Sequence, residues 1–454
     1  MYRLLNIIFC IADVLIAMIS LQMREYQAGA LLLFLSSLLR FIFKLSNGSF
    51  FLELIYLHTT LTCLLMPVIG YTYFDQTNPL ARLWVKYMPV TELTYFGFLI
   101  PATVSLGLAF FISRVKSKDD HTVINPLVAE LKLSIQKIPS KSILILAFAS
   151  LIAYFISRML PAAFQQINTF LYFSFYTSIF YVYYYANFPY RKIFLLLAVV
   201  FILNDALRSS MFTIIAYMSG IFMILILAER KISVAKRILF ICGGFAFLVF
   251  VQLFKLNWRQ ARVSGTQDVT EIVALTASKT STNQVKSILF PIYLRMNQGY
   301  NIALVQRRIP QYVDYLGGDY LVLTFTSAFV PRLFWPDKPA AGGRYNMLMY
   351  TGKTIRGWST NVGPLGEAYG NFGNIGGWFY MFGFGLFIRF AYTRYLQICK
   401  KRPILFIWMP VLFFQVVYVM ETDSLQAFNS LIKGAIFIFV MYKLFPSLFP
   451  KSTS

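Results

Sequence analysis

The chain alternates long apolar segments with short polar connections. A helix needs about 20 mostly apolar residues to cross the hydrocarbon core of a bilayer, and we trace about twelve such segments, the seventh of them short. Their approximate ranges are 4–22, 28–45, 50–72, 93–113, 142–160, 168–187, 192–206, 209–228, 237–256, 373–393, 403–420 and 425–446. The pattern predicts an all-α polytopic membrane protein with about 12 transmembrane helices.

The cations between these segments predict the orientation of the chain. Lys and Arg are enriched in short cytoplasmic loops. Four connections are rich in them: 114–141, 187–192, 229–237 and 394–402. A count of about twelve spans places all four on one side of the membrane. We expect this side to be the cytoplasm, and both termini to lie there as well.

The same count divides the chain into three parts. Residues 1–256 form an N-terminal transmembrane bundle of about nine spans, 257–372 form a large loop on the outer side, and 373–454 form a C-terminal bundle of about three spans. The loop carries twelve Lys and Arg against six acids. Because long structureless loops are uncommon, we expect it to contain short helices that lie on the membrane face.

The composition narrows the class of function. Hydrophobic residues make up 58% of the chain and charged residues 13%, whereas about a quarter of a soluble domain is charged. This excludes an ordinary cytosolic enzyme and a disordered protein. The net charge of +23 belongs to a chain whose main partner is the lipid bilayer, so no nucleic-acid partner is expected.

Few metal ligands are present. The chain has two histidines and four cysteines, and the cysteines are not spaced as ligand pairs. A zinc centre or a disulfide framework is therefore disfavoured. We expect any enzyme of this sequence to be metal-independent and to use no cofactor.

A proline-rich turn at 329–339 is the densest candidate for chemistry. Its three prolines forbid a regular helix and stiffen the backbone, which can hold Arg332, Trp335 and Lys338 in fixed directions. Arginine suits bidentate phosphate binding, and a tryptophan ring can stack on a sugar. The alternative is an interfacial turn, in which Trp335 belongs to an aromatic belt and the cations contact lipid headgroups.

A glycine-rich segment at 359–373 contains Glu367, the only acid between Asp337 and Glu421. A lone carboxylate at the start of a span is costly unless it is paired or catalytic. Glu367 is therefore a candidate general base or arginine partner, with a structural salt bridge as the alternative. The glycines at 373, 377, 383 and 385 predict a helix-packing face.

Arginines recur on the expected outer side, where topology does not call for cations. They are Arg208, Arg259, Arg262, Arg295 and Arg344. Charge-assisted hydrogen bonds contribute about 1.5–3 kcal/mol each, so several arginines could bind a diphosphate. The alternatives are pairing with outer-leaflet phospholipid or with nearby acids.

Three charged residues lie inside the predicted spans. Asp13, Arg40 and Glu53 are expected to pair with one another, because an unpaired charge in the membrane is costly. His58 is expected to be an interior histidine whose polar atoms have partners.

The two motifs resemble those of the bacterial oligosaccharide repeat-unit polymerases, the O-antigen polymerase (Wzy) family. The resemblance rests on Pro331-Arg332-Leu333-Phe334-Trp335-Pro336-Asp337-Lys338-Pro339, followed by Gly366-Glu367-Ala368-Tyr369-Gly370-Asn371-Phe372-Gly373. It covers about 45 residues as a motif, while the spans and the large outer loop extend it to the whole chain.

The resemblance implies a membrane glycosyltransferase with an architecture like that of the C-type enzymes. It would act at the periplasmic face of the bacterial inner membrane on two undecaprenyl-diphosphate-linked glycans, and its product length can depend on a chain-length co-polymerase. The growing chain would leave its lipid diphosphate and join a lipid-linked repeat unit. The resemblance gives motif roles to Arg332, Lys338 and Glu367, and a looser likeness includes Arg208, Arg259 and Arg295.

Two other functions stay open. A transporter or flippase of lipid-linked oligosaccharides should show two similar halves and charges along a central pathway, and neither stands out here. An acyl- or other group transferase is weakened by the lack of a histidine on the outer side. A shared cavity lined by the outer arginines and Glu367 would favour the polymerase.

Overall fold

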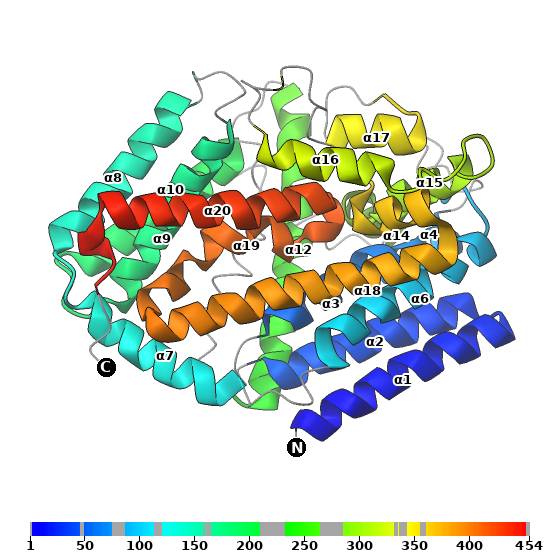
Figure 1. Cartoon of the computed structure of the whole chain (residues 1–454), viewed down its shortest axis with the longest axis horizontal. Coiled ribbons are helices and arrows are strands. Elements are labelled where there is room, and N and C mark those ends of the chain that lie inside the picture. The colour runs from blue at the N-terminus through cyan, green and yellow to red at the C-terminus, as the bar shows by residue number, and fades with distance from the viewer. Residues whose placement is uncertain are drawn as a thin grey trace.

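The computed structural model describes most of the chain as a bundle of helices (Figure 1). The described residues are 2–45, 50–74, 87–112, 120–157, 159, 165–208, 232–263, 285–330, 335, 343–354 and 360–450. Within these ranges the regular structure is helical and no strand occurs. The expectation of an all-α protein is confirmed for this part of the chain.

Among the described residues, five helical segments are long and apolar enough to cross a membrane. They are Leu4–Met23, Tyr26–Lys44, Phe51–Tyr73, Glu92–Phe111 and Ser424–Leu444. The number rises to six if the bent pair Pro126–Ile135 and Ser140–Ala153 is one span. The described part of the chain is thus all-α and contains helices suited to a membrane.

The N-terminal helices pack around a buried ion pair. These helices are α1 (Tyr2–Met23), α2 (Tyr26–Lys44), α3 (Phe51–Thr60), η1 (Leu61–Leu65), α4 (Met66–Tyr73) and α6 (Glu92–Phe111). Arg40 of α2 donates to Asp13 of α1 at 2.8 Å, and Ser36 donates to the other carboxylate oxygen at 2.5 Å. The expected pairing of Asp13 with Arg40 is confirmed.

Helix α7 (Asp120–Ile135) occupies a range in which the cation-rich pattern predicts only a loop. It turns by 95° into α8 (Ser140–Ser157). Leu127, Leu131 and Ile135 are buried at helical spacing, and Lys132 lies between them in sequence. An amphipathic helix can therefore bury one face and keep Lys132 accessible on the other, which is why the charge pattern of this range did not reveal it.

The remaining helices connect the N-terminal part to the C-terminal bundle. They are α9 (Gln165–Tyr184), α10 (Arg191–Arg208), α12 (Val234–Val263), α14 (Val285–Met296), α15 (Gly299–Arg308), α16 (Asp319–Phe329) and α17 (Gly343–Thr351). Helix α12 continues past residue 256, the expected end of its span. Four short helices, α14 to α17, thus lie within the long loop 257–372.

The C-terminal part consists of two long helices and a broken segment between them. These elements are α18 (Gly363–Lys401), η4 (Pro403–Trp408), α19 (Met409–Val417), η5 (Val419–Glu421), α20 (Ser424–Leu444) and η6 (Pro446–Leu448). Gly373 has a φ of 67°, so α18 kinks there. The kink separates the short segment that carries Glu367 from the rest of the helix, and only glycine adopts this backbone conformation without strain.

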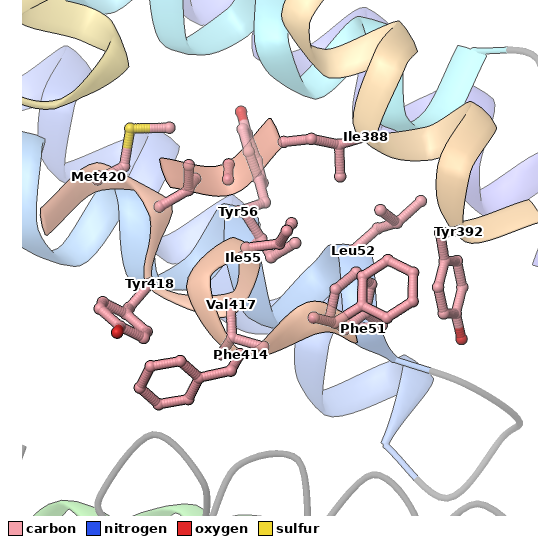
Figure 2. Close-up of a cluster of buried hydrophobic side chains, with 14 of the residues drawn as sticks. Phe51, Leu52, Ile55, Tyr56, Ile388, Tyr392, Phe414, Val417, Tyr418 and Met420 are labelled. Atoms are coloured by element: carbon pink, nitrogen blue, oxygen red, sulfur yellow. The ribbon is translucent and has the colours of Figure 1, made fainter. Parts of the chain in front are cut away.

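A buried apolar cluster joins α3 to α18 and to the segment around α19 (Figure 2). The ring of Phe51 stacks on Tyr392 at 4.7 Å and meets Phe413 edge-on at 5.0 Å. Ile55 and Ile388 are fully buried in the same cluster. These contacts fix the C-terminal helices against the N-terminal ones.

The glycines of α18 divide between a packed face and an open one. A Cβ atom added at Gly385 would lie 2.7 Å from Cβ of Ala109 on α6, and one at Gly377 would lie 2.7 Å from the Phe98 ring. A Cβ atom at Gly383 would have no neighbour within 4 Å. The predicted packing face is therefore confirmed for residues 377 and 385. Gly383 lies on an open side of the helix, where it contacts no neighbouring helix at its Cβ position.

Replacing Gly385 by leucine should destabilise the protein, because the added side chain has no room between α18 and α6. Overpacking of this kind costs about 1–3 kcal/mol. The matched control is Gly383→Leu on the same helix, which should unfold at the wild-type temperature. Thermal unfolding of the purified proteins in detergent, followed by tryptophan fluorescence, measures both. Equal midpoints for the two variants would contradict the assigned helix contact.

Candidate functional site

Two buried carboxylates lie close together where the long loop meets the C-terminal helices. Glu367 is on the first segment of α18, before the Gly373 kink, and Asp423 is the N-cap residue of α20. Each is 2% exposed. The backbone N–H of Ser424, the residue after Asp423, donates to Oε2 of Glu367 at 3.0 Å. The start of α20 thus donates a hydrogen bond to Glu367 and contains Asp423 as its N-cap residue.

Neutral donors hold Asp423. Its Oδ1 accepts from the backbone N–H of Gln426 at 2.6 Å, and its Oδ2 accepts from Asn361 at 2.7 Å and from the Gln426 side chain at 3.0 Å. Three donors favour the ionised form of this carboxyl group. They are also the reason that α20 begins here, since an N-cap acid satisfies the free N–H groups of the first turn.

A chain of side-chain amides connects the two acids. Asn346 of α17 donates to Oε1 of Glu367 at 3.2 Å and to Oδ1 of Asn361 at 3.1 Å. The backbone carbonyl of Asn361 accepts from Gln298 at 2.6 Å and from Asn301 at 3.0 Å. Residues of α15, α17, α18 and α20 are thereby tied into one buried polar network.

Burial raises the pKa of Glu367 to about 8, and the nearby negative charge of Asp423 adds to this rise. Hydrogen bonds from Ser424 and Asn346 act in the opposite direction. Burial also raises the pKa of Asp423, against the effect of its hydrogen bonds from Gln426 and Asn361. Asp423 directly precedes the candidate membrane span Ser424–Leu444, and Glu367 lies before the kink of α18 at Gly373. Glu367 can therefore take up or release a proton near neutral pH.

A third acid at this junction, Glu421, contacts an arginine and a histidine. Oε2 of Glu421 lies 2.7 Å from the guanidinium of Arg295, and Oε1 lies 3.3 Å from Nε2 of His58. Arg295 is 32% exposed. This triad joins α3, α14 and η5. Its acid, Glu421, lies two residues before Asp423 in the chain. His58 has a polar partner, as the sequence predicts.

The predicted site residues lie in different parts of the structure, and some lie outside the described part. Glu367 lies in the network, Arg295 lies in the neighbouring triad, Arg344 is exposed at the start of α17, and Trp335 is half-buried. Arg208, Arg259 and Arg262 are on helices, but their side chains are outside the described part. Arg332 and Lys338 also lie outside the described residues. The expected common cavity of arginines and Glu367 thus remains a prediction.

Sequence reasoning missed Asp423 and the asparagines at 346 and 361 as partners of Glu367. One signal was present: Glu421 and Asp423 stand between two predicted spans, at 403–420 and 425–446. Acids at such a junction lie at the membrane boundary on the same expected side as the long loop. The asparagines gave no signal, because their role depends on contacts between distant segments.

Comparison with known proteins found no matching family profile, no matching curated protein and no matching solved structure. Among the described residues, no group of three or more His, Cys, Asp or Glu side chains is arranged to hold a metal ion. The described arrangement is a pair of buried carboxyl groups, in which burial raises the pKa of both Glu367 and Asp423.

Replacing Glu367 by glutamine should make the stability of the protein less dependent on pH. The pKa of Glu367 rises from its ordinary 4.5 to about 8 on folding, so between these values the folded state binds more protons than the unfolded state. Stability therefore falls as pH rises through this window, by at most about 1.4 kcal/mol per pH unit. Thermal unfolding in detergent at pH 5.5 and pH 8.5 should show a smaller difference for Glu367→Gln than for the wild type.

The control for this measurement is Asp314→Asn, which removes an exposed carboxylate of the same loop. It should keep the wild-type dependence on pH. If Glu367→Gln also kept that dependence in full, the carboxyl group would not have the shifted pKa.

Proposed function

We propose that the protein is a membrane glycosyltransferase that polymerises lipid-linked oligosaccharide repeat units, with Glu367 as its general base. The observation that carries this proposal is the buried Glu367 carboxylate, whose described donors are an amide and a backbone N–H. A general base works best when its pKa lies near the operating pH. The resemblance of the surrounding glycine-rich segment to the O-antigen polymerases supports the same role.

The reaction follows from this base. Glu367 takes the proton of a hydroxyl group on the incoming repeat unit, and the resulting oxygen nucleophile attacks the anomeric carbon of the growing glycan. The glycosidic carbon–oxygen bond forms while the bond from that carbon to the lipid diphosphate breaks. Undecaprenyl diphosphate leaves with the electron pair, and cations stabilise its charge. Arg332 and Lys338 are the cations that the motif assigns, with Arg208, Arg259, Arg262, Arg295 and Arg344 as further candidates.

The proposal includes a location for the chemistry. About twelve spans would place the long loop at the periplasmic face of the inner membrane and both termini in the cytoplasm. Lipid-linked donors are reasonable there, because nucleotide sugars are made in the cytoplasm. Glu367 and Asp423 lie just before apolar helices, where a lipid diphosphate would meet the aqueous phase.

Polymerisation of a defined undecaprenyl-diphosphate-linked repeat unit by the purified protein tests the proposal. Glu367→Gln should lower the rate about 100-fold or more, because general-base catalysis contributes about 10²–10⁴-fold. Arg332→Ala should also leave an inserted protein that makes little polymer. Asp314→Asn should make polymer at the wild-type rate. A glutamine variant with full activity would remove Glu367 from the mechanism.

The same assay separates a polymerase from a flippase. A flippase would move the lipid-linked unit across a vesicle membrane and form no glycosidic bond. Transport without any increase in glycan length would contradict the proposed function.

Asp423 should affect the pKa of the proposed general base, Glu367. Its negative charge raises the pKa of Glu367, so Asp423→Asn should lower that pKa. The polymerisation rate of this variant should therefore reach its plateau at a lower pH than the wild-type rate does. A pH–rate profile from pH 5 to pH 9 measures the shift. An unchanged profile with merely reduced amplitude would indicate that Asp423 only supports the structure.

A further inference from the structure

A cavity of about 320 Å³ lies beside the carboxylate network, between α16, α18 and α20. In Figure 1, the red helix α20 runs between α16 and the orange helix α18. Most of the wall is aromatic carbon. The cavity is lined by Phe325, Tyr380, Gly383, Phe384, Phe387, Ser424 and Phe428. A wall of this kind favours an apolar occupant.

Packed rings give the cavity a fixed shape. Phe428 of α20 meets Phe325 of α16 edge-on at 5.1 Å and contacts Phe387 of α18 at 5.4 Å. Tyr380 and Phe384 stack at 6.2 Å on α18. Aromatic pairs at these distances stabilise one another beyond the area that they bury. These ring contacts join the three helices around the cavity.

The cavity has one polar end, and that end adjoins the carboxylates. The Tyr380 hydroxyl donates to Oγ of Ser424 at 2.8 Å. Ser424 in turn donates its backbone N–H to Glu367 at 3.0 Å. Phe428 lies one turn further along α20, so the cavity extends from the polar network toward the apolar part of that helix.

Large apolar side chains outside the cavity lining are also exposed on α16 and α18, two of the helices that form the cavity. Phe379 and Phe390 of α18 are 73% and 59% exposed, and Val322 and Phe329 of α16 are 64% and 61% exposed. Large apolar side chains exposed at this density indicate contact with hydrocarbon. The occupant can therefore enter from the membrane.

Positive charge follows the cavity wall in the sequence. Phe329, whose ring contacts Phe428 at 5.7 Å, is followed within nine residues by Arg332 and Lys338. A molecule with a hydrocarbon chain and an anionic head complements an apolar wall whose chain continues into a segment that carries cations.

We propose that this cavity binds the isoprenoid chain of the lipid-linked substrate next to its diphosphate, and so directs the head group toward Glu367. The proposal rests on the proposed function, because it takes its occupant from that reaction. The volume is at the low end for ligand pockets, so the cavity holds only the first stretch of the chain. The rest of the chain lies among the bilayer lipids.

Gly383 provides a way to fill the cavity without disturbing the helix contacts. A side chain at this position meets no atom within 4 Å at its Cβ, although Gly383 itself lines the cavity. Gly383→Leu should therefore fold and occupy the binding space. Gly97→Leu is the matched control, because its Cβ position is equally open and Gly97 lies on α6, away from the cavity.

Photocrosslinking tests the occupant. We would introduce p-benzoylphenylalanine in place of Phe387 in the cavity, or in place of the exposed Phe379 on the same helix as a control. The full chain would be placed in nanodiscs of phosphatidylethanolamine and phosphatidylglycerol that contain a small fraction of undecaprenyl diphosphate. Mass spectrometry of the adducts should show about a tenfold enrichment of the isoprenoid at position 387 over position 379.

Adding Gly383→Leu to the Phe387 probe should abolish this enrichment, whereas Gly97→Leu should leave it unchanged. Phospholipid adducts alone at position 387, or an enrichment that Gly383→Leu does not alter, would overturn the proposal. The readout is binding, so it separates the two proposals. Isoprenoid capture without polymerisation would reject only the proposed function, and polymerisation without capture would reject only this site.

Discussion

The junction of α17, α18 and α20 depends on the burial of two carboxylates among neutral donors. Removing a carboxylate from water is costly unless its oxygens receive hydrogen bonds. Here an amide and a backbone N–H serve Glu367, and three donors serve Asp423. These donors come from separate segments of the chain, so α17, α18 and α20 must meet in one arrangement to supply them. The same requirement explains the buried asparagines, whose amides have both a donor and an acceptor to offer.

Two further acids show what is different about this pair. Asp13 is matched by Arg40 at 2.8 Å, and Glu421 by Arg295 at 2.7 Å. Each of these two acids has a cation beside it, and the ion pair joins two helical elements. The described hydrogen-bond donors of Glu367 are neutral. The charge that acts on its pKa is the negative charge of Asp423, which raises it. Carboxylates in such surroundings are enriched at functional sites, because their protons can move near neutral pH.

The sequence predicted the helical class, most helix positions and Glu367, because each leaves a local signal. Runs of apolar residues mark helices, and a single acid in a glycine-rich segment is conspicuous. Other features depend on contacts between distant segments. Gly383 and Gly385 look alike in the sequence, yet only Gly385 packs against α6. Asp423 becomes a partner of Glu367 only because α20 starts beside α18, and the cation-rich range before α8 hides the amphipathic helix α7.

The network adjoins the start of α20, a helix long and apolar enough to cross a membrane. Tyr380 and Ser424 belong both to the aromatic cavity and to the hydrogen bonds that reach Glu367. A water-soluble substrate would make no use of the aromatic wall, and an ordinary hydrocarbon would make no use of the carboxylates. A molecule that joins a hydrocarbon chain to a polar, reactive head uses both. The kink at Gly373 is essential to this arrangement, because it lets one helix present an acid to the head group and, beyond the bend, an apolar surface to the chain.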